Sequence, residues 1–431
     1  MAELVPFPFD RLVTAMFRSL DERDAIFDVP RNRFFATPDG LNFGARHHGR
    51  RAATPLGPAA GPHSQMAQNI VMAFLVGARI VELKTVQVND ELVLPRPCID
   101  APNLCFNVEW SQELRVPQTV VEYVKGSMLI DMLVASGQLH LGAGDADVLF
   151  DLSVGYDLAG IQSEKVSAGF LDPMRDASAI VDRLRAEIPA EFAHLRDLDF
   201  RTQLSETVTL STFHGCPPDE VEGICTWLIE AKGIDTIVKL NPMLLGRERM
   251  HELLHGQMGY TDVIVPDSAF ERDMPWQQAV GIVGRLRERA AARDVGFGVK
   301  LTNTCIVENN RAVFPASEKE MYLSGPPLHV LAMNLVERFR ATFGPHMPIS
   351  FSAGIEATNF GDAVALGLRP VTVCTDWLKK GGYGRAAKYF KQLEKRMAKA
   401  DVTDLEAWSI AWSGAAGRLL DDALASAPAD A

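Results

Sequence analysis

Short runs of apolar, β-branched residues recur along the chain, and amphipathic segments separate them. The runs are nearly continuous in apolar residues, which is typical of strands buried on both faces of a parallel sheet. Helical periodicity is clearest over residues 217–233, 276–293 and 327–344, and Gly233 is a suitable residue to end the first of these helices. Nine segments have the strand pattern: residues 54–56, 79–86, 148–154, 207–212, 236–241, 262–266, 295–302, 348–353 and 370–375.

Alternating strands and helices predict an α/β fold, and we expect a (β/α)8 barrel. Such a barrel has eight strands, so we interpret one of the nine candidates, "DVIVP" at residues 262–266, as an insertion. Residues 1–50 and 385–431 lie outside the repeat and are expected to form helical extensions. The barrel then occupies residues 51–384 as one domain, because no internal repeat or low-complexity linker divides it.

The composition narrows the classes of partner and compartment. Of 431 residues, 47% are hydrophobic, enough for a large core, and the net charge of −12 disfavours nucleic acid and anionic membranes as partners. The first residues lack the pattern of a secretory leader, and the longest apolar run, residues 70–78, is far shorter than the roughly 20 residues of a membrane span. The six cysteines form no CxxC pair, so we expect a cytoplasmic protein without a metal site.

The loop after the first predicted strand carries no bulky side chain. In "TPLGPAAGPHSQ", residues 54–65, the six positions 57–62 are all Gly, Ala or Pro. Such a backbone can approach a flat ring closely and offer its N–H groups to ring heteroatoms, while the prolines limit its freedom. The alternative is a tight turn that needs small residues for packing alone.

Lysines interrupt three of the apolar strands. Lys84 and Thr85 end the second strand, Lys239 lies in the fifth, and Lys300 lies in the next. A buried lysine is costly unless its ammonium reaches a polar site or a partner, so lysines at strand ends suit a bound anion. The alternative is that each side chain extends to solvent at its strand end.

Two later strand ends, "SAGI" at residues 352–355 and "VCTDW" at residues 373–377, lead directly into helices. Barrel enzymes often bind phosphate at such positions through backbone N–H groups, and Thr375 could add a hydroxyl. Asp376 would repel a phosphate unless its carboxylate points away. Two ordinary turns would give the same pattern.

The fourth strand continues into "STFHGCPPDEV", residues 211–221, which offers His214 and Cys216. Either side chain can transfer a proton near neutral pH, Cys216 only if its pKa is lowered. A cysteine that is simply buried is the alternative.

In this order, over residues 52–378, the motifs resemble the flavin domains of dihydropyrimidine dehydrogenase and dihydroorotate dehydrogenase. The resemblance rests on "PLGPAAGP", "LKTV", "VKLNP", Asn303-Thr304, Ser324-Gly325, Ala353-Gly354 and Cys374-Thr375. A closer resemblance covers nearly the whole chain. It is to the amino-terminal part of bacterial selenate reductase-type flavin/iron–sulfur oxidoreductases, which are associated with purine catabolism, and it rests on "LKTVQ", "PCID", "SVGY", "TLST", "HGCPP" and "GVKLTNT".

The resemblance implies a dihydroorotate dehydrogenase-type barrel that binds FMN. The small-residue loop would lie under the flavin ring, the two lysines would stabilise the reduced flavin, and the later strand ends would bind the phosphate. By this resemblance the cofactor-binding residues are Ala59, Ala60, Gly61, Lys84, Thr85, Lys239, Thr304, Ser324, Gly325, Ala353, Gly354, Cys374 and Thr375, and the substrate-binding residues are Asp157, Thr209 and Asn303.

The chain departs from the pyrimidine enzymes where a proton must be transferred. Those enzymes have Asn-Leu-Ser-Cys on the fourth strand, and residues 209–212 here read Thr-Leu-Ser-Thr. The cysteine acid is therefore missing at its position, and His214, Cys216 and Ser211 remain as candidates. Asp157 replaces a substrate-binding asparagine, so a different ring edge could be recognised.

We therefore expect an FMN-dependent reductase or dehydrogenase of a cyclic amide or ureide, such as a purine or pyrimidine. The resembling oxidoreductases continue into FAD, NAD(P)H and cluster domains, so electrons are expected from a separate partner subunit, and we expect an oligomer. One alternative is a flavin-free barrel lyase or aldolase that forms a Schiff base on Lys84, Lys239 or Lys300. Another is a non-catalytic scaffold subunit of an oxidoreductase complex.

Overall fold

Eight parallel strands form a barrel in the computed structural model, which describes residues 4–89, 92, 96–108, 111–211 and 216–414. Around the sheet the order is β5-β16-β15-β12-β11-β10-β9-β6. The two end strands meet where the Arg79 N–H donates to the Leu56 carbonyl at 2.8 Å, which brings the sheet close to closure. In chain order the strands are β5 (Leu56–Pro58), β6 (Ile80–Glu82), β9 (Leu149–Val154), β10 (Thr207–Leu210), β11 (Asp235–Leu240), β12 (Phe297–Leu301), β15 (Ile349–Phe351) and β16 (Val371–Val373).

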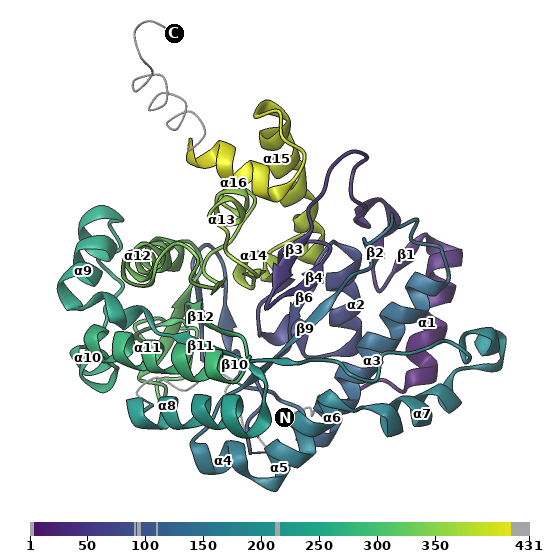
Figure 1. The fold of residues 1–431 in the computed structure, drawn as a ribbon, viewed down its shortest axis with the longest axis horizontal. Helices are drawn as coiled ribbons and strands as arrows, with labels where there is room; N and C mark the ends of the chain where they lie inside the picture. Colours follow the sequence, from purple (N-terminus) through teal and green to yellow (C-terminus); the bar gives the residue numbers. More distant parts are fainter. Residues whose placement is uncertain (1–3, 90–91, 93–95, 109–110, 212–215, 415–431) are drawn as a thin grey trace, which may run out of the picture.

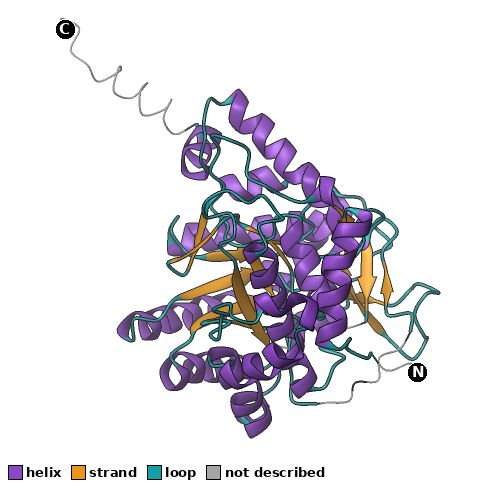
Figure 2. Cartoon of the chain, turned by 90° about the vertical axis from the view of Figure 1, so that its right-hand side faces the viewer, coloured by secondary structure: helices purple, strands orange, loops and turns teal. Residues whose placement is uncertain are grey.

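Helices follow each strand and surround the barrel (Figures 1 and 2). The longest are α3, α12 and α11, and the loop after β9 carries four short helices in succession. The helices between and after the strands are α2 (Ala67–Leu75), α3 (Val116–Ala135), α4 (Leu158–Gln162), α5 (Glu164–Val166), α6 (Asp172–Arg175), α7 (Ser178–Glu187), α8 (Pro218–Trp227), α9 (Arg247–His251), α10 (Asp267–Arg272), α11 (Trp276–Ala292), α12 (Pro326–Phe343), α13 (Phe360–Ala365) and α14 (Thr375–Leu378).

The predicted barrel is confirmed, including the choice of insertion, because residues 262–266 form no strand. Three predicted helices are also present, and Gly233 adopts a φ of +60° at the end of the first. The second strand is shorter than its apolar run. After β6 the chain leaves the ladder and pairs again only at Val86, which brings Lys84 and Thr85 over the barrel end.

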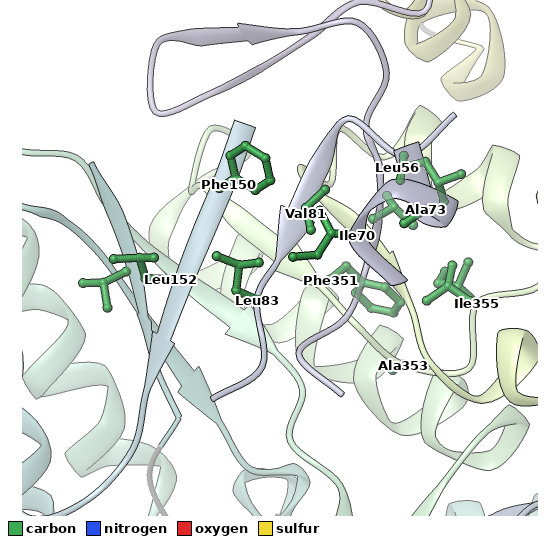
Figure 3. Close-up of a cluster of buried hydrophobic side chains, with 14 of the residues drawn as sticks. Leu56, Ile70, Ala73, Val81, Leu83, Phe150, Leu152, Phe351, Ala353 and Ile355 are labelled. Atoms are coloured by element: carbon green, nitrogen blue, oxygen red, sulfur yellow. The ribbon is translucent and has the colours of Figure 1, made fainter. Parts of the chain in front are cut away.

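Side chains alternate between two different environments along the strands. Apolar residues such as Leu56 and Val81 point outward and pack under α2, near Ala73 and Ile70, and Phe150 lies on the outer face of β9 (Figure 3). The residues between them point into the barrel, and there they are unusually polar. Barrel interiors are commonly filled by branched apolar side chains, whereas this one holds Glu82, Asp151, Ser153, Thr209, Lys239, Lys300, Ser350 and Thr372.

The chain outside the barrel is helical only in part, which corrects the expectation for residues 1–50. At the amino terminus a helix, α1 (Phe9–Arg23), is followed by two hairpins, β1 (Ala25–Ile26) with β2 (Val29–Pro30) and β3 (Ala45–His47) with β4 (Arg50–Ala52). The second hairpin lies at the amino ends of the strands, because Arg50 pairs with Glu206 and Asp235 there. After the barrel, α15 (Ala386–Lys399) and α16 (Leu405–Ser413) pack near α13.

A second, antiparallel sheet was not anticipated from the sequence. Its order is β13-β14-β8-β7, with β7 (Ile99–Asp100), β8 (Cys105–Asn107), β13 (Cys305–Glu308) and β14 (Glu320–Ser324). These strands come from the loops after β6 and β12, so the sheet stands over the carboxyl ends of the barrel strands. None of the described helices is long and apolar enough to cross a membrane.

Candidate active site

A cavity of about 390 Å³ opens at the carboxyl ends of the barrel strands, within the roughly 300–1,000 Å³ of typical small-molecule clefts. The antiparallel sheet contributes to its walls through Ile99, Asn107 and Tyr322. Most of the residues singled out in the sequence meet here: Ala59, Ala60, Gly61, Lys84, Thr85, Thr209, Lys239, Asn303, Thr304, Ser324, Ala353, Gly354, Cys374 and Thr375 line the cavity.

Four predicted site residues are not among the described residues that line it. Gly325 lies directly behind the wall, where an added Cβ would be 3.4 Å from Thr375. Asp157 caps α4 and accepts the Gly160 N–H at 2.7 Å. Cys216 is buried beside a separate small cavity, where burial raises the pKa of its thiol to about 12. His214 lies outside the described residues.

The small-residue loop has two structural reasons for its composition. At Gly57 a Cβ would lie 1.7 Å from the Ile80 carbonyl oxygen, so this glycine is needed to close the barrel. Ala59 and Ala60 form cavity wall, and their N–H groups donate to Val373 O at 2.9 Å and Glu82 Oε2 at 3.3 Å. The packing interpretation therefore holds at Gly57. Ala59 and Ala60 form open wall, but their N–H groups are paired within the barrel and are not offered to a ring as the sequence interpretation supposed.

Lys84 and Lys239 place two buried amines at the cavity. Lys84 is 2% exposed, and the Lys239 Nζ donates to Ser211 Oγ at 3.1 Å. Burial removes hydration from the charged form and lowers the pKa of each amine to about 8. Lys84 does not extend to solvent as the alternative supposed, and Lys239 is half-buried with its amine on Ser211. Both are largely protonated at pH 7, so this wall is electropositive.

The opposite side of the cavity combines hydroxyls with glycine backbone. Ser324 Oγ and Thr375 Oγ1 lie 3.0 Å apart. Gly354 has a φ of +52°, and a Cβ there would be 2.3 Å from the Gly325 carbonyl oxygen. The strand end therefore requires glycine at this position.

Asp376 does not oppose an anion at this end, because its carboxylate points away from the cavity. It accepts two hydrogen bonds from Arg385, at 2.6 and 2.8 Å, and one from Tyr389 at 2.6 Å. The condition set from the sequence is met.

Comparison of the sequence with known proteins identifies a family with the same fold. Residues 27–416 match the family model described as "Oxidoreductase YgfK, N-terminal TIM-barrel domain". The chain belongs to this family. YgfK proteins of Escherichia coli strain K12 and of E. coli O157:H7 are each 38% identical to it over 408 residues. The match covers 90% of this chain and 39% of each relative, so the chain spans about two fifths of their length.

In this YgfK-type barrel, the third lysine differs from the other two. Lys300 forms a buried ion pair with Glu82, and both residues line the cavity. The Lys300 Nζ also lies 3.3 Å from the hydroxyls of Ser350 and Thr372, and both hydroxyls donate to Glu82 at 3.2 Å. Its charge is therefore neutralised inside the barrel.

The sequence interpretation missed two buried carboxylates near the cavity. Glu82 lies in "IVELK" and Asp151 in "LFDLSV", each in the middle of an apolar strand. A charged residue in such a run was the signal that identified the lysines, and the same signal would have found these acids. Among the described residues, no group of three or more His, Cys, Asp and Glu side chains is arranged to hold a metal ion.

Proposed function

We propose that this domain binds FMN and reduces or dehydrogenates a cyclic amide or ureide, such as a purine or pyrimidine ring. One observation carries the proposal: two largely protonated lysines, buried Lys84 and half-buried Lys239, share one cavity with a wall of small residues at the active end of the barrel. Membership of the YgfK oxidoreductase family supports redox chemistry.

The residues present fit FMN. Ala59, Ala60 and Gly61 have small side chains or none and leave room for a flat ring in the cavity. Gly61 is also required by packing, because its ideal Cβ would lie 2.9 Å from the His63 ring. Lys84 and Lys239 would hold the electron-rich edge of the ring by their charge. Bound FMN would supply hydride transfer to or from a carbon of the substrate ring.

The phosphate of FMN would lie at the hydroxyl and glycine side of the cavity. Ser324 and Thr375 offer hydroxyl donors there, and Gly354 exposes backbone without a side chain. The carboxylate nearest in sequence, Asp376, is occupied by Arg385. The Asp376 carboxylate therefore does not repel an anion bound at this end of the cavity.

Substrate recognition falls to the remaining polar wall. The Asn303 Oδ1 accepts the Thr304 N–H at 3.0 Å, which leaves the Asn303 amide N–H₂ to donate toward a carbonyl in the cavity. Thr209 lines the same wall, and its hydroxyl donates to Asp151 Oδ2 at 2.8 Å rather than into the cavity. The Asn303 donor suits a carbonyl oxygen of an amide or ureide ring.

We assign proton transfer to Ser211. Of Ser211 and Cys216, only Ser211 lines the main cavity, and the Lys239 amine holds its hydroxyl at 3.1 Å. An amine with a pKa of about 8 can take up or release a proton near neutral pH and so assist the hydroxyl. Electrons would come from a separate subunit or region with FAD, NAD(P)H or iron–sulfur centres.

The visible spectrum of the purified protein, with chromatography of its released cofactor, tests the proposal. Stoichiometric FMN is the expected result, followed by anaerobic titration with uric acid, xanthine and pyrimidines. A colourless protein that does not bind added FMN would refute it. The lowered pKa of Lys84 and Lys239 also suits a Schiff base, so borohydride trapping with a carbonyl compound then tests the lyase alternative.

A further inference from the structure

A buried carboxyl group lies directly behind the cavity wall. Asp151 is in the middle of β9, points into the barrel and is 1% exposed. Its Oδ2 accepts the Thr209 hydroxyl at 2.8 Å, while its Oδ1 has no hydrogen-bond partner among the described residues. Burying an ionised carboxylate with so few hydrogen bonds is energetically costly.

The charges around Asp151 do not offset the cost of burying its ionised form. Glu82 on β6 repels it, and the nearest cation, Lys300 on β12, is already paired with Glu82. Lys239 on β11 and His47 on β3 each interact with Lys300 as well. Burial first, and Glu82 second, raise the pKa of Asp151 to about 7, although the hydroxyls of Thr209 and Thr207 favour the ionised form.

Thr209 connects this carboxyl group to the cavity, because its side chain lines the cavity and touches Asp151 at once. Its hydroxyl carries a single proton. With Asp151 ionised, that proton is committed to Oδ2, and only lone pairs face the cavity. With Asp151 neutral, the carboxyl O–H can donate to Thr209, and the Thr209 proton is free to turn toward a ligand.

We propose that binding of FMN in the main cavity is coupled, through Thr209, to uptake of one proton at Asp151. A ligand atom that accepts a hydrogen bond, such as a ring carbonyl oxygen, selects the state in which Thr209 donates. The proton comes from solvent, and only an O–H bond on the carboxyl group forms. Asp151 acts through Thr209 and is a positioning residue. The choice of FMN rests on the proposed function; the titration of Asp151 does not.

Calorimetric titration with FMN in buffers of different ionisation enthalpy measures the protons taken up. Between pH 6 and 7.5, below the pKa of the lysines, we expect net uptake of up to one proton and an affinity that falls up to tenfold per pH unit above pH 7. Asp151→Asn and Thr209→Val should abolish the uptake and flatten the pH dependence. Asp131→Asn removes a half-buried carboxyl group whose pKa is also raised, one that accepts the Arg201 N–H outside the cavity, and should keep the uptake.

Unchanged uptake in Asp151→Asn or Thr209→Val would overturn the proposal. A second measurement needs no FMN: carboxyl ¹³C NMR should show Asp151 titrating near pH 7, and at a higher pH still in Thr209→Val, which loses the hydroxyl that favours the charge. Titration of Asp151 in the ordinary aspartate range near 4 would overturn the proposal by itself. A protein that does not bind FMN would refute the proposed cofactor, and the NMR titration would still decide the state of Asp151.

Discussion

Replacing Glu82 by Gln should strand a positive charge inside the barrel. Glu82 accepts hydrogen bonds from Lys300, Ser350, Thr372 and the Ala60 N–H, and it is 2% exposed. The glutamine amide has nearly the same shape but no charge. Its N–H₂ group replaces one carboxylate oxygen, so a donor then faces groups that themselves donate. The Lys300 ammonium could still donate to the amide oxygen and to the hydroxyls of Ser350 and Thr372, each 3.3 Å away, but it would lose the carboxylate charge paired with it.

The expected cost is about 3–5 kcal/mol of unfolding free energy, as for other buried ion pairs that lose one partner. An independent bound comes from deprotonation of the stranded amine. An ordinary lysine with a pKa of about 10.4 costs ~4.6 kcal/mol to neutralise at pH 7, and this cost falls by ~2.7 kcal/mol at pH 9. The defect of Glu82→Gln should therefore shrink as the pH rises from 7 to 9.

Urea unfolding followed by circular dichroism, at pH 7 and at pH 9, measures both effects. Glu191→Gln is the control, because it breaks an exposed ion pair with Arg18. The Glu191 side chain is 42% exposed and the Arg18 side chain 59%, so the change should cost less than about 1 kcal/mol. Replacing Glu82 by Leu and Lys300 by Met together should cost at least about 2 kcal/mol less than the sum of the single changes. A Glu82→Gln protein within about 1 kcal/mol of wild type at pH 7 would refute the account of the barrel interior.

Three further predictions concern the cavity. Lys84→Met should weaken FMN retention at least tenfold and lower the reduction potential of the bound flavin, measured by equilibrium dialysis and redox titration; an unchanged potential would contradict its electrostatic role. Ser211→Ala should slow substrate turnover at least tenfold in stopped-flow experiments while flavin reduction is unchanged, and Cys216→Ala should alter neither step; the reverse pattern would move proton transfer to Cys216. Gly354→Ala should lower the thermal midpoint and abolish FMN binding, because its Cβ would meet the Gly325 carbonyl at 2.3 Å and its φ is +52°; wild-type behaviour would contradict the close approach.

The barrel could be predicted because its strands lie between the polar interior and the helices, and their outward residues are strongly apolar. The antiparallel sheet could not, because its strands are not continuous apolar runs like those of the barrel. In β14, for example, Glu320, Tyr322 and Ser324 alternate with buried Met321 and Leu323. Such a sheet forms through long-range pairing, here of Leu323 with Phe106, which a local pattern does not contain.

The cavity walls were predicted best where backbone geometry limits the side chain. Gly61, Gly354 and the two alanines stand at strand ends of a barrel, and the fold brings all strand ends together whatever the loops do. Asp157 was chosen by its position in a motif alone, and the local structure uses it to cap α4. A loop residue can turn its side chain either way, whereas a residue inside a strand cannot.

The polar barrel interior shows where an interpretation by single residues fails. Lys300 has the same sequence signal as Lys84 and Lys239, an ammonium in an apolar strand, yet it is neutralised by Glu82, which lies 218 positions away in the chain. Buried charges seldom occur alone, so Lys239 and Lys300 on the neighbouring strands β11 and β12 already favoured carboxylates on the strands across the barrel. Glu82 and Asp151 meet that requirement, and because only one of them has a lysine to itself, the other is the group that can hold a proton at neutral pH. The unequal pairing of these charges connects the fold to the proposed chemistry.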